Sequence, residues 1–153
     1  AQWDIRDHLS TKTMYTPKND FSAPPDTCSP VQVNLVARHG ARYPTSSDIQ
    51  KFDALAEKMR QYAALYKPGY EWMGNWTNPY TPQQAGELTY SGQVEHYNMA
   101  QRMMEEYSGP MGSPYQPYTY QFQSTQVSRA ARSGVSYGYS FTQNQTNGIL
   151  PYP

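Results

Sequence analysis

The sequence predicts an α/β fold that this chain does not complete. Apolar residues at alternate positions between 31 and 37 predict a buried strand. Three segments with helical periodicity follow, separated by loops rich in proline and glycine. The resulting order of strand, helix, loop, helix, strand and helix calls for further strands to close a sheet. We therefore expect an extended arm over residues 1–30 and the first part of a larger α/β domain over residues 31–153.

The strand signal is strongest just before a cluster of polar residues. Val31, Val33 and Leu35 alternate with Gln32 and Asn34. In an open α/β sheet, ligands bind just beyond the carboxyl ends of the strands. The residues that follow position 37 are therefore the first place to look for a site.

Helix signals account for most of the remaining chain. Three helices are predicted over about residues 49–66, 90–107 and 128–141. Several N-cap candidates at 45–48 precede the first helix, and Thr89 is the expected N-cap of the second. The first helix should stop at the Lys-Pro-Gly sequence of residues 67–69. A short strand with alternating aromatic residues is predicted at 118–123.

The second helix carries both apolar residues and one histidine. Its expected buried face comprises Val94, Tyr97, Ala100, Met104 and Tyr107. His96 lies between them, and we interpret it as a hydrogen-bonded structural histidine.

The cluster after the first strand, residues 38–45, reads RHGARYPT. Arg38 and Arg42 carry permanent charge and present forked donors suited to phosphate oxygens. His39 lies between them and can act as a nucleophile or a proton carrier. The formal net charge is +0, so the composition does not favour a nucleic-acid partner, and any anion site must come from a local cluster.

These residues resemble a known family. Residues 38–45 match the R-H-G-x-R-x-P-T motif of the histidine acid phosphatases, in the branch that holds phytases and multiple inositol polyphosphate phosphatases. Residues 85–93, AGELTYSGQ, resemble the A-G-E-L-T-x-x-G segment of the inositol polyphosphate phosphatases. Residues 129–137, RAARSGVSY, resemble a helix start that supplies another phosphate-binding arginine, and residues 8–13 resemble the arm before the catalytic strand.

The resemblance implies a three-layer α/β/α core and a mechanism. His39 would attack phosphorus to form a phosphohistidine, which water then hydrolyses, while Arg38, Arg42 and Arg129 would hold the phosphoryl oxygens. No metal and no other cofactor is implied, since the arginines carry the compensating charge. The implied substrate is a phosphorylated small molecule, specifically an inositol polyphosphate such as phytate.

One part of the family pattern is missing from this sequence. Family members carry, far downstream, a histidine followed by an acidic residue that protonates the leaving group. The histidines here are His8, His39 and His96, and none fits that role. We therefore expect this chain to be the amino-terminal part of a longer or two-chain enzyme, with the remaining carboxy-terminal part as a candidate partner.

Several features favour a secreted protein. Asn75 and Asn144 begin Asn-x-Thr sequons, so both are predicted glycosylation sites. Cys28 is the single cysteine, and we expect it to pair with a cysteine outside this chain, although a buried free cysteine is the alternative. No apolar run reaches membrane-spanning length.

Two other functions are considered. Residues 134–138, GVSYG, spell the nucleophile elbow of α/β-hydrolases. That elbow requires a preceding strand and a later histidine, and no histidine follows Ser136. The second alternative is a secreted, non-catalytic binding or structural subunit with a phosphatase-derived fold, which the missing proton donor favours.

Overall fold

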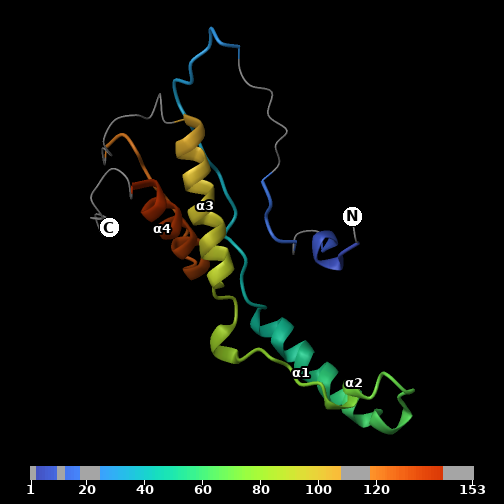
Figure 1. The fold of residues 1–153 in the computed structure, drawn as a ribbon. Coiled ribbons are helices and arrows are strands. Elements are labelled where there is room, and N and C mark those ends of the chain that lie inside the picture. Colours follow the sequence, from blue (N-terminus) through green and yellow to red (C-terminus); the bar gives the residue numbers. More distant parts are fainter. Residues whose placement is uncertain (1–2, 10–12, 18–24, 108–117, 143–153) are drawn as a thin grey trace. The chain divides into compact units, whose positions relative to one another are not determined.

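The computed structural model describes residues 3–9, 13–17, 25–107 and 118–142 (Figure 1). Within these ranges the regular elements are helices, and no extended strand of two or more residues forms. The chain divides into two compact units. We call residues 42–87 the helical insert, and the unit that combines residues 1–41 with 88–153 the main unit.

The helical insert begins with the long helix α1, Ser46–Gln61. Thr45 is its N-cap, and a capping box joins Thr45 and Asp48. The cap predicted at 45–48 is thus confirmed. The helix begins and ends earlier than predicted, because Tyr62 leaves helical geometry and a short 3₁₀ turn, η3 (Ala63–Leu65), follows.

A tight turn redirects the chain after η3. The backbone N–H of Tyr70 donates to the carbonyl of Lys67 at 3.0 Å, and Gly69 adopts a φ of 93°. Glycine takes this left-handed conformation without a steric penalty. The short helix α2, Trp72–Asn75, then packs beside α1, and η4, Pro82–Gln84, follows (Figure 1).

The main unit is built on two helices, α3 (Tyr90–Tyr107) and α4 (Ser128–Thr142), which lie side by side (Figure 1). The hydroxyl of Thr89 accepts the N–H of Gly92 at 3.1 Å, which confirms the predicted cap of α3. The predicted bounds of both helices hold to within a residue. A 3₁₀ turn, η1 (Ile5–His8), lies in the amino-terminal arm.

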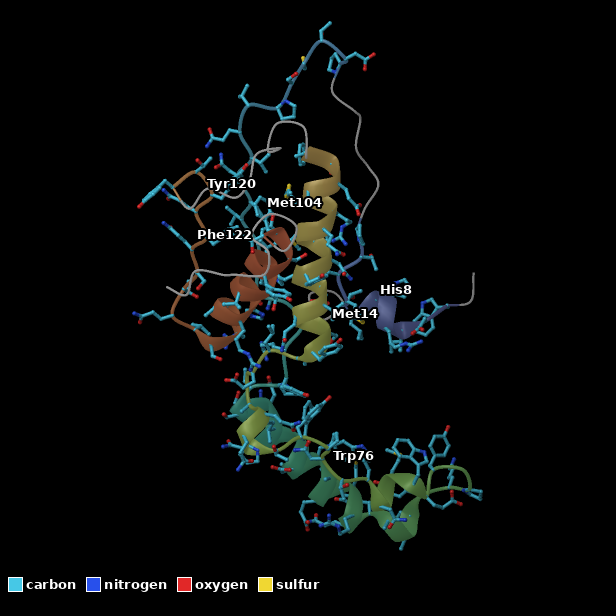
Figure 2. The ribbon with its side chains drawn as sticks, turned by 60° about the vertical axis from the view of Figure 1, so that its left-hand side comes forward. His8, Met14, Trp76, Met104, Tyr120 and Phe122 are labelled. Carbon is cyan, nitrogen blue, oxygen red and sulfur yellow. The ribbon has the colours of Figure 1, made fainter. Side chains whose placement is uncertain are left out.

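Aromatic side chains form the core between α3 and α4. Ala100, Tyr137 and Phe141 are buried together. The ring of Phe141 lies 5.3 Å from that of Tyr120 and 5.5 Å from that of Phe122, both on the segment beside α4 (Figure 2). Burial of Tyr137 raises the pKa of its phenol to about 12.

The buried face of α3 agrees with the prediction only in part, since Ala100 is buried and Met104 packs against the same core. Gly92, His96 and Ala100 are the buried residues, whereas Val94 and Tyr97 are only half-buried. A polar backbone segment, residues 38–41, packs against the first half of the helix. Hydrophobic periodicity does not register a contact made by backbone atoms, so the burial of Gly92 and His96 was not predicted.

Neither predicted strand, 31–37 or 118–123, forms in the described residues. Val31 and Val36 are each 98% exposed. A strand is stable only when a neighbour satisfies its backbone groups and covers its side chains, and no neighbouring strand is present in this part of the chain. The three-layer core and the domain bounds at residue 30 remain predictions.

We expect Phe141→Ala to lower the free energy of unfolding by about 3 kcal/mol or more, because a buried aromatic ring is replaced by a cavity. Phe141 is 4% exposed, whereas Tyr118, 93% exposed, is the matched aromatic control. Chemical denaturation of both alanine variants provides the measurement. Equal loss of stability in the two variants would contradict the assigned core.

Candidate functional site

The motif loop, residues 38–41, lies against α3 at two glycines. A Cβ added to Gly40 would lie 2.7 Å from the Cα of Gly92 and overlap its carbonyl oxygen. A Cβ added to Gly92 would lie 2.7 Å from the nitrogen of Ala41. Both obstructing groups are backbone atoms, which cannot rotate away. The close approach of loop and helix therefore requires glycine at both positions.

Hydrogen bonds from both helices hold the backbone of the motif loop. Nε2 of His96 on α3 donates to the carbonyl of Arg38 at 3.0 Å. The N–H of Gly40 donates to Oγ of Ser133 on α4 at 3.1 Å. The N–H of Ala41 donates to Oε2 of Glu95 at 2.7 Å.

The carbonyl of Ala41 completes this set of contacts. It accepts from the backbone N–H of Thr89 at 2.9 Å and from its hydroxyl at 2.7 Å. Thr89 thus caps α3 and binds the loop with the same side chain. Because the loop is joined to two packed helices, its conformation depends on how α3 and α4 pack.

His39 makes a hydrogen bond that defines its tautomer. Its Nδ1 lies 2.8 Å from the carbonyl oxygen of Gly40, which can only accept. Nδ1 therefore carries the proton, and in the neutral ring Nε2 keeps its lone pair. Nε2 is the nitrogen able to act as a nucleophile or a proton acceptor.

A cavity of about 720 Å³ lies beside the motif loop in the main unit. Its lining includes Arg38, His39, His96 and Ser133, together with Tyr120 and Phe122 from the segment before α4. This volume is in the usual range for small-molecule sites. Arg38 supplies the one permanent positive charge among the lining residues that the structure describes.

Arg42 and Arg129, the other two predicted arginines, are not among the described residues that line this cavity. Arg129 is in the first turn of α4, and its carbonyl accepts the hydroxyl of Ser133 at 2.8 Å. Its Nε is buried and has no hydrogen-bond partner in the described part of the chain, although the residue does not line the cavity. Arg42 begins the helical insert, where its Nη1 donates to the carbonyl of Tyr43 at 2.7 Å.

The position of Ser136 rules out the alternative that it is the nucleophile of an α/β-hydrolase elbow. Ser136 lies inside α4, and its hydroxyl donates to the carbonyl of Arg132 one turn earlier, at 2.9 Å. A nucleophile elbow requires a sharp turn between a strand and a helix. The structure therefore gives no support to the α/β-hydrolase alternative.

The remaining predicted residues are Asn75, Cys28 and Asn144. Asn75 is exposed at the end of α2. Cys28 is an exposed free thiol, so the alternative of a buried cysteine is wrong. Asn144 lies outside the described residues. Where the structure describes the chain, it contains no helix able to span a membrane and no group of three or more potential metal ligands.

The sequence did not single out Glu95 as a site residue, and Gly92 stood out only as the last glycine of the segment at residues 85–93. Together with Thr89 and His96 they recur at spacings of three or four along α3, which places them on one helical face. This spacing was present in the sequence. It was hidden because the face is polar and glycine-containing, and so gives no hydrophobic signal.

Burial lowers the pKa of His96, and the nearby His39 acts in the same direction. The bond to the Arg38 carbonyl and the charge of Glu95 oppose this shift. The buried ring is therefore held in its neutral form.

We expect Gly92→Ala to lower the free energy of unfolding by roughly 1–3 kcal/mol, because its methyl group meets backbone atoms that must move. Gly138→Ala is the matched control, since its Cβ would lie 3.9 Å from Phe122, an ordinary contact. The control should be neutral or slightly stabilised, because alanine favours helix. A Gly92→Ala variant as stable as Gly138→Ala would disprove the close approach.

We expect His96→Asn to flatten the loss of stability on acidification below pH 6.5, the ordinary pKa of histidine. The folded-state pKa is lowered, so between that value and 6.5 the unfolded state binds more protons and acid favours unfolding. Asparagine removes this proton uptake. Urea denaturation across this pH window tests the effect, with the exposed His8→Asn as control. Identical slopes for wild type and His96→Asn would refute it.

Comparison with known proteins finds relatives that are named as phosphatases. It is 29% identical over 170 residues to an acid phosphatase of Schizosaccharomyces pombe, covering 98% of this chain and 36% of that protein. It is 33% identical over 84 residues to multiple inositol polyphosphate phosphatase 1 of Dictyostelium discoideum, covering 55% of this chain and 13% of the relative. Over 79 residues it is 27% identical to phytase PHO112 of Candida albicans, covering 50% of this chain and 17% of the relative.

These relatives are much longer than the segment matched, so the chain spans between 13% and 36% of their lengths. No solved structure matches the chain significantly. The family profile of the histidine phosphatase superfamily, branch 2, matches residues 31–149. This match covers most of the chain and includes the motif loop and both helices that hold it. The chain belongs to the histidine phosphatase superfamily, branch 2.

Proposed function

We propose that this chain is part of a phosphomonoester hydrolase that acts through a phosphohistidine on His39, with inositol polyphosphates such as phytate as substrates. The observation that carries the proposal is the 2.8 Å contact between Nδ1 of His39 and the carbonyl of Gly40. Because that bond places the proton on Nδ1, the lone pair of Nε2 is available for attack, and the ring lines the cavity.

The proposed reaction has two steps. Nε2 of His39 attacks phosphorus, and the bond from phosphorus to the ester oxygen breaks. The leaving oxygen takes up a proton from a donor that we do not assign to any residue of this chain. Water then attacks the phosphohistidine, the N–P bond breaks, and inorganic phosphate leaves with the imidazole restored.

Arg38, Arg42 and Arg129 are the proposed phosphate-binding residues. Arg38 lines the cavity with His39, which supports its role directly. The buried, unpartnered Nε of Arg129 supports an anionic ligand near the start of α4, since an unpaired buried donor is costly. For Arg42 the support is its place in the family motif.

The proposed substrate class rests on the names of two relatives, an inositol polyphosphate phosphatase and a phytase. Such substrates carry several phosphate groups, and each of them needs positively charged groups to bind it. Among the described residues that line the cavity, only Arg38 has a permanent positive charge, so binding of several phosphates would require cations beyond these residues. Export from the cell, glycans at Asn75 and Asn144, and a disulfide from Cys28 to a cysteine outside this sequence also remain proposals; exposure of Asn75 and Cys28 is compatible with them.

The test is phosphate release from phytate and from p-nitrophenyl phosphate by the complete protein. His39→Ala should lower the rate by several orders of magnitude, because the nucleophile is lost. His8→Ala, which removes an exposed histidine on η1, should have no effect. Rapid quenching at alkaline pH should trap a phosphohistidine in the wild type only.

Phosphate release by His39→Ala at the wild-type rate would rule out the mechanism. A wild-type protein that binds phytate without releasing phosphate would instead favour the non-catalytic binding subunit. Activity on p-nitrophenyl phosphate but not on phytate would retain the mechanism and reject the substrate class.

A further inference from the structure

We propose that Glu95 is a positioning residue for the motif loop, and that its carboxylate, by occupying the N–H of Ala41, leaves phosphate recognition to side chains. This inference rests on the proposed phosphatase function for its kinetic consequences. The contact itself, from the N–H of Ala41 to Oε2 of Glu95 at 2.7 Å, is independent of that function.

The contact is distinctive among those that hold the loop. His96 and Ser133 bind the loop through neutral groups, at 3.0 and 3.1 Å. Glu95 supplies a carboxylate at a shorter distance, and hydrogen bonds to ionised acceptors are about twice as strong as neutral ones. The side chain is half-buried, so solvent competes less for it than for an exposed glutamate.

Its position connects it to the reactive residue. Ala41 follows Gly40, whose carbonyl accepts Nδ1 of His39. Fixing the N–H of Ala41 fixes the peptide plane between Gly40 and Ala41, because the peptide bond is planar. The same plane contains the carbonyl oxygen that selects the tautomer of His39. Glu95 therefore sets the direction in which Nε2 of His39 points.

The contact also determines how an anion can be bound. Successive backbone N–H groups in a glycine-containing loop commonly cradle phosphate. Here the N–H groups of Gly40 and Ala41 are already taken by Ser133 and Glu95. A phosphoryl group must then be held by guanidinium groups, and the nearby carboxylate adds a negative charge that opposes tight binding of the anion.

Two variants of equal length separate these effects. Glu95→Gln keeps an oxygen acceptor and removes the charge, whereas Glu95→Met keeps the length and removes the acceptor. We expect kcat of Glu95→Gln to stay within about threefold of wild type, with a lower inhibition constant for inorganic phosphate. We expect kcat of Glu95→Met to fall at least about tenfold, because a displaced nucleophile loses its attack geometry. Glu105→Met is the control, since Glu105 is exposed on the same helix.

A second readout does not depend on activity. In ¹⁵N-alanine-labelled protein the Ala41 amide should be protected from hydrogen exchange in the wild type and in Glu95→Gln, and should lose protection in Glu95→Met. If the wild type releases no phosphate but this pattern is seen, the positioning contact stands and the proposed function fails.

A Glu95→Met variant with wild-type kcat and a protected Ala41 amide would overturn the inference while leaving the phosphatase function intact. An inhibition constant for inorganic phosphate that is unchanged in Glu95→Gln would overturn only the claim that the charge of Glu95 opposes anion binding. Should Glu95→Met fail to fold, Glu95→Asp decides, since its carboxylate is one methylene shorter. A lowered kcat in that variant supports the inference, and a wild-type kcat with full amide protection overturns it.

Discussion

The close approach between the backbone of the motif loop and the first turns of α3 is the contact on which the site depends. It exists because neither Gly40 nor Gly92 has a Cβ. At this separation Thr89 and Glu95 reach the backbone of Ala41. Ser133 reaches Gly40 from α4, so both helices fix one short loop. A side chain at either glycine would separate the backbones and break several of these hydrogen bonds together.

In this arrangement the backbone groups of the motif loop and its side chains have different roles. The polar backbone groups of the loop are largely satisfied by protein partners, so they stabilise the loop instead of a ligand. The side chains of Arg38 and His39 line the cavity. In the proposed mechanism, recognition of phosphate thus falls to guanidinium groups, whose fixed charge and forked geometry suit phosphoryl oxygens. The buried, unpartnered Nε of Arg129 agrees with such a division.

Local signals in the sequence predicted the N-caps and the bounds of α3 and α4 well. Thr45 and Thr89 are N-caps, and the bounds of α3 and α4 lie within a residue of those expected. Caps and hydrophobic periodicity act within a few residues, so they can be found in a single sequence. The predicted strands at 31–37 and 118–123 depend on neighbours that local signals cannot supply, and they do not form in the described residues. The burial of Gly92 and His96 on α3 was missed for a similar reason, since backbone atoms of the motif loop cover them.

The sequence alone singled out Arg38, His39 and Arg42 as candidate site residues, because they stand together in a specific Arg-His-Gly-x-Arg motif. It also determined the helices, since caps and amphipathic periods are local properties. The tertiary structure decided which nitrogen of His39 is free, because that depends on the carbonyl of Gly40. It also decided that Glu95, His96 and Ser133 hold the loop, because their partners lie between 54 and 93 residues away in the chain. Contacts over such separations arise only when α3 and α4 pack, and no local pattern in the sequence encodes them.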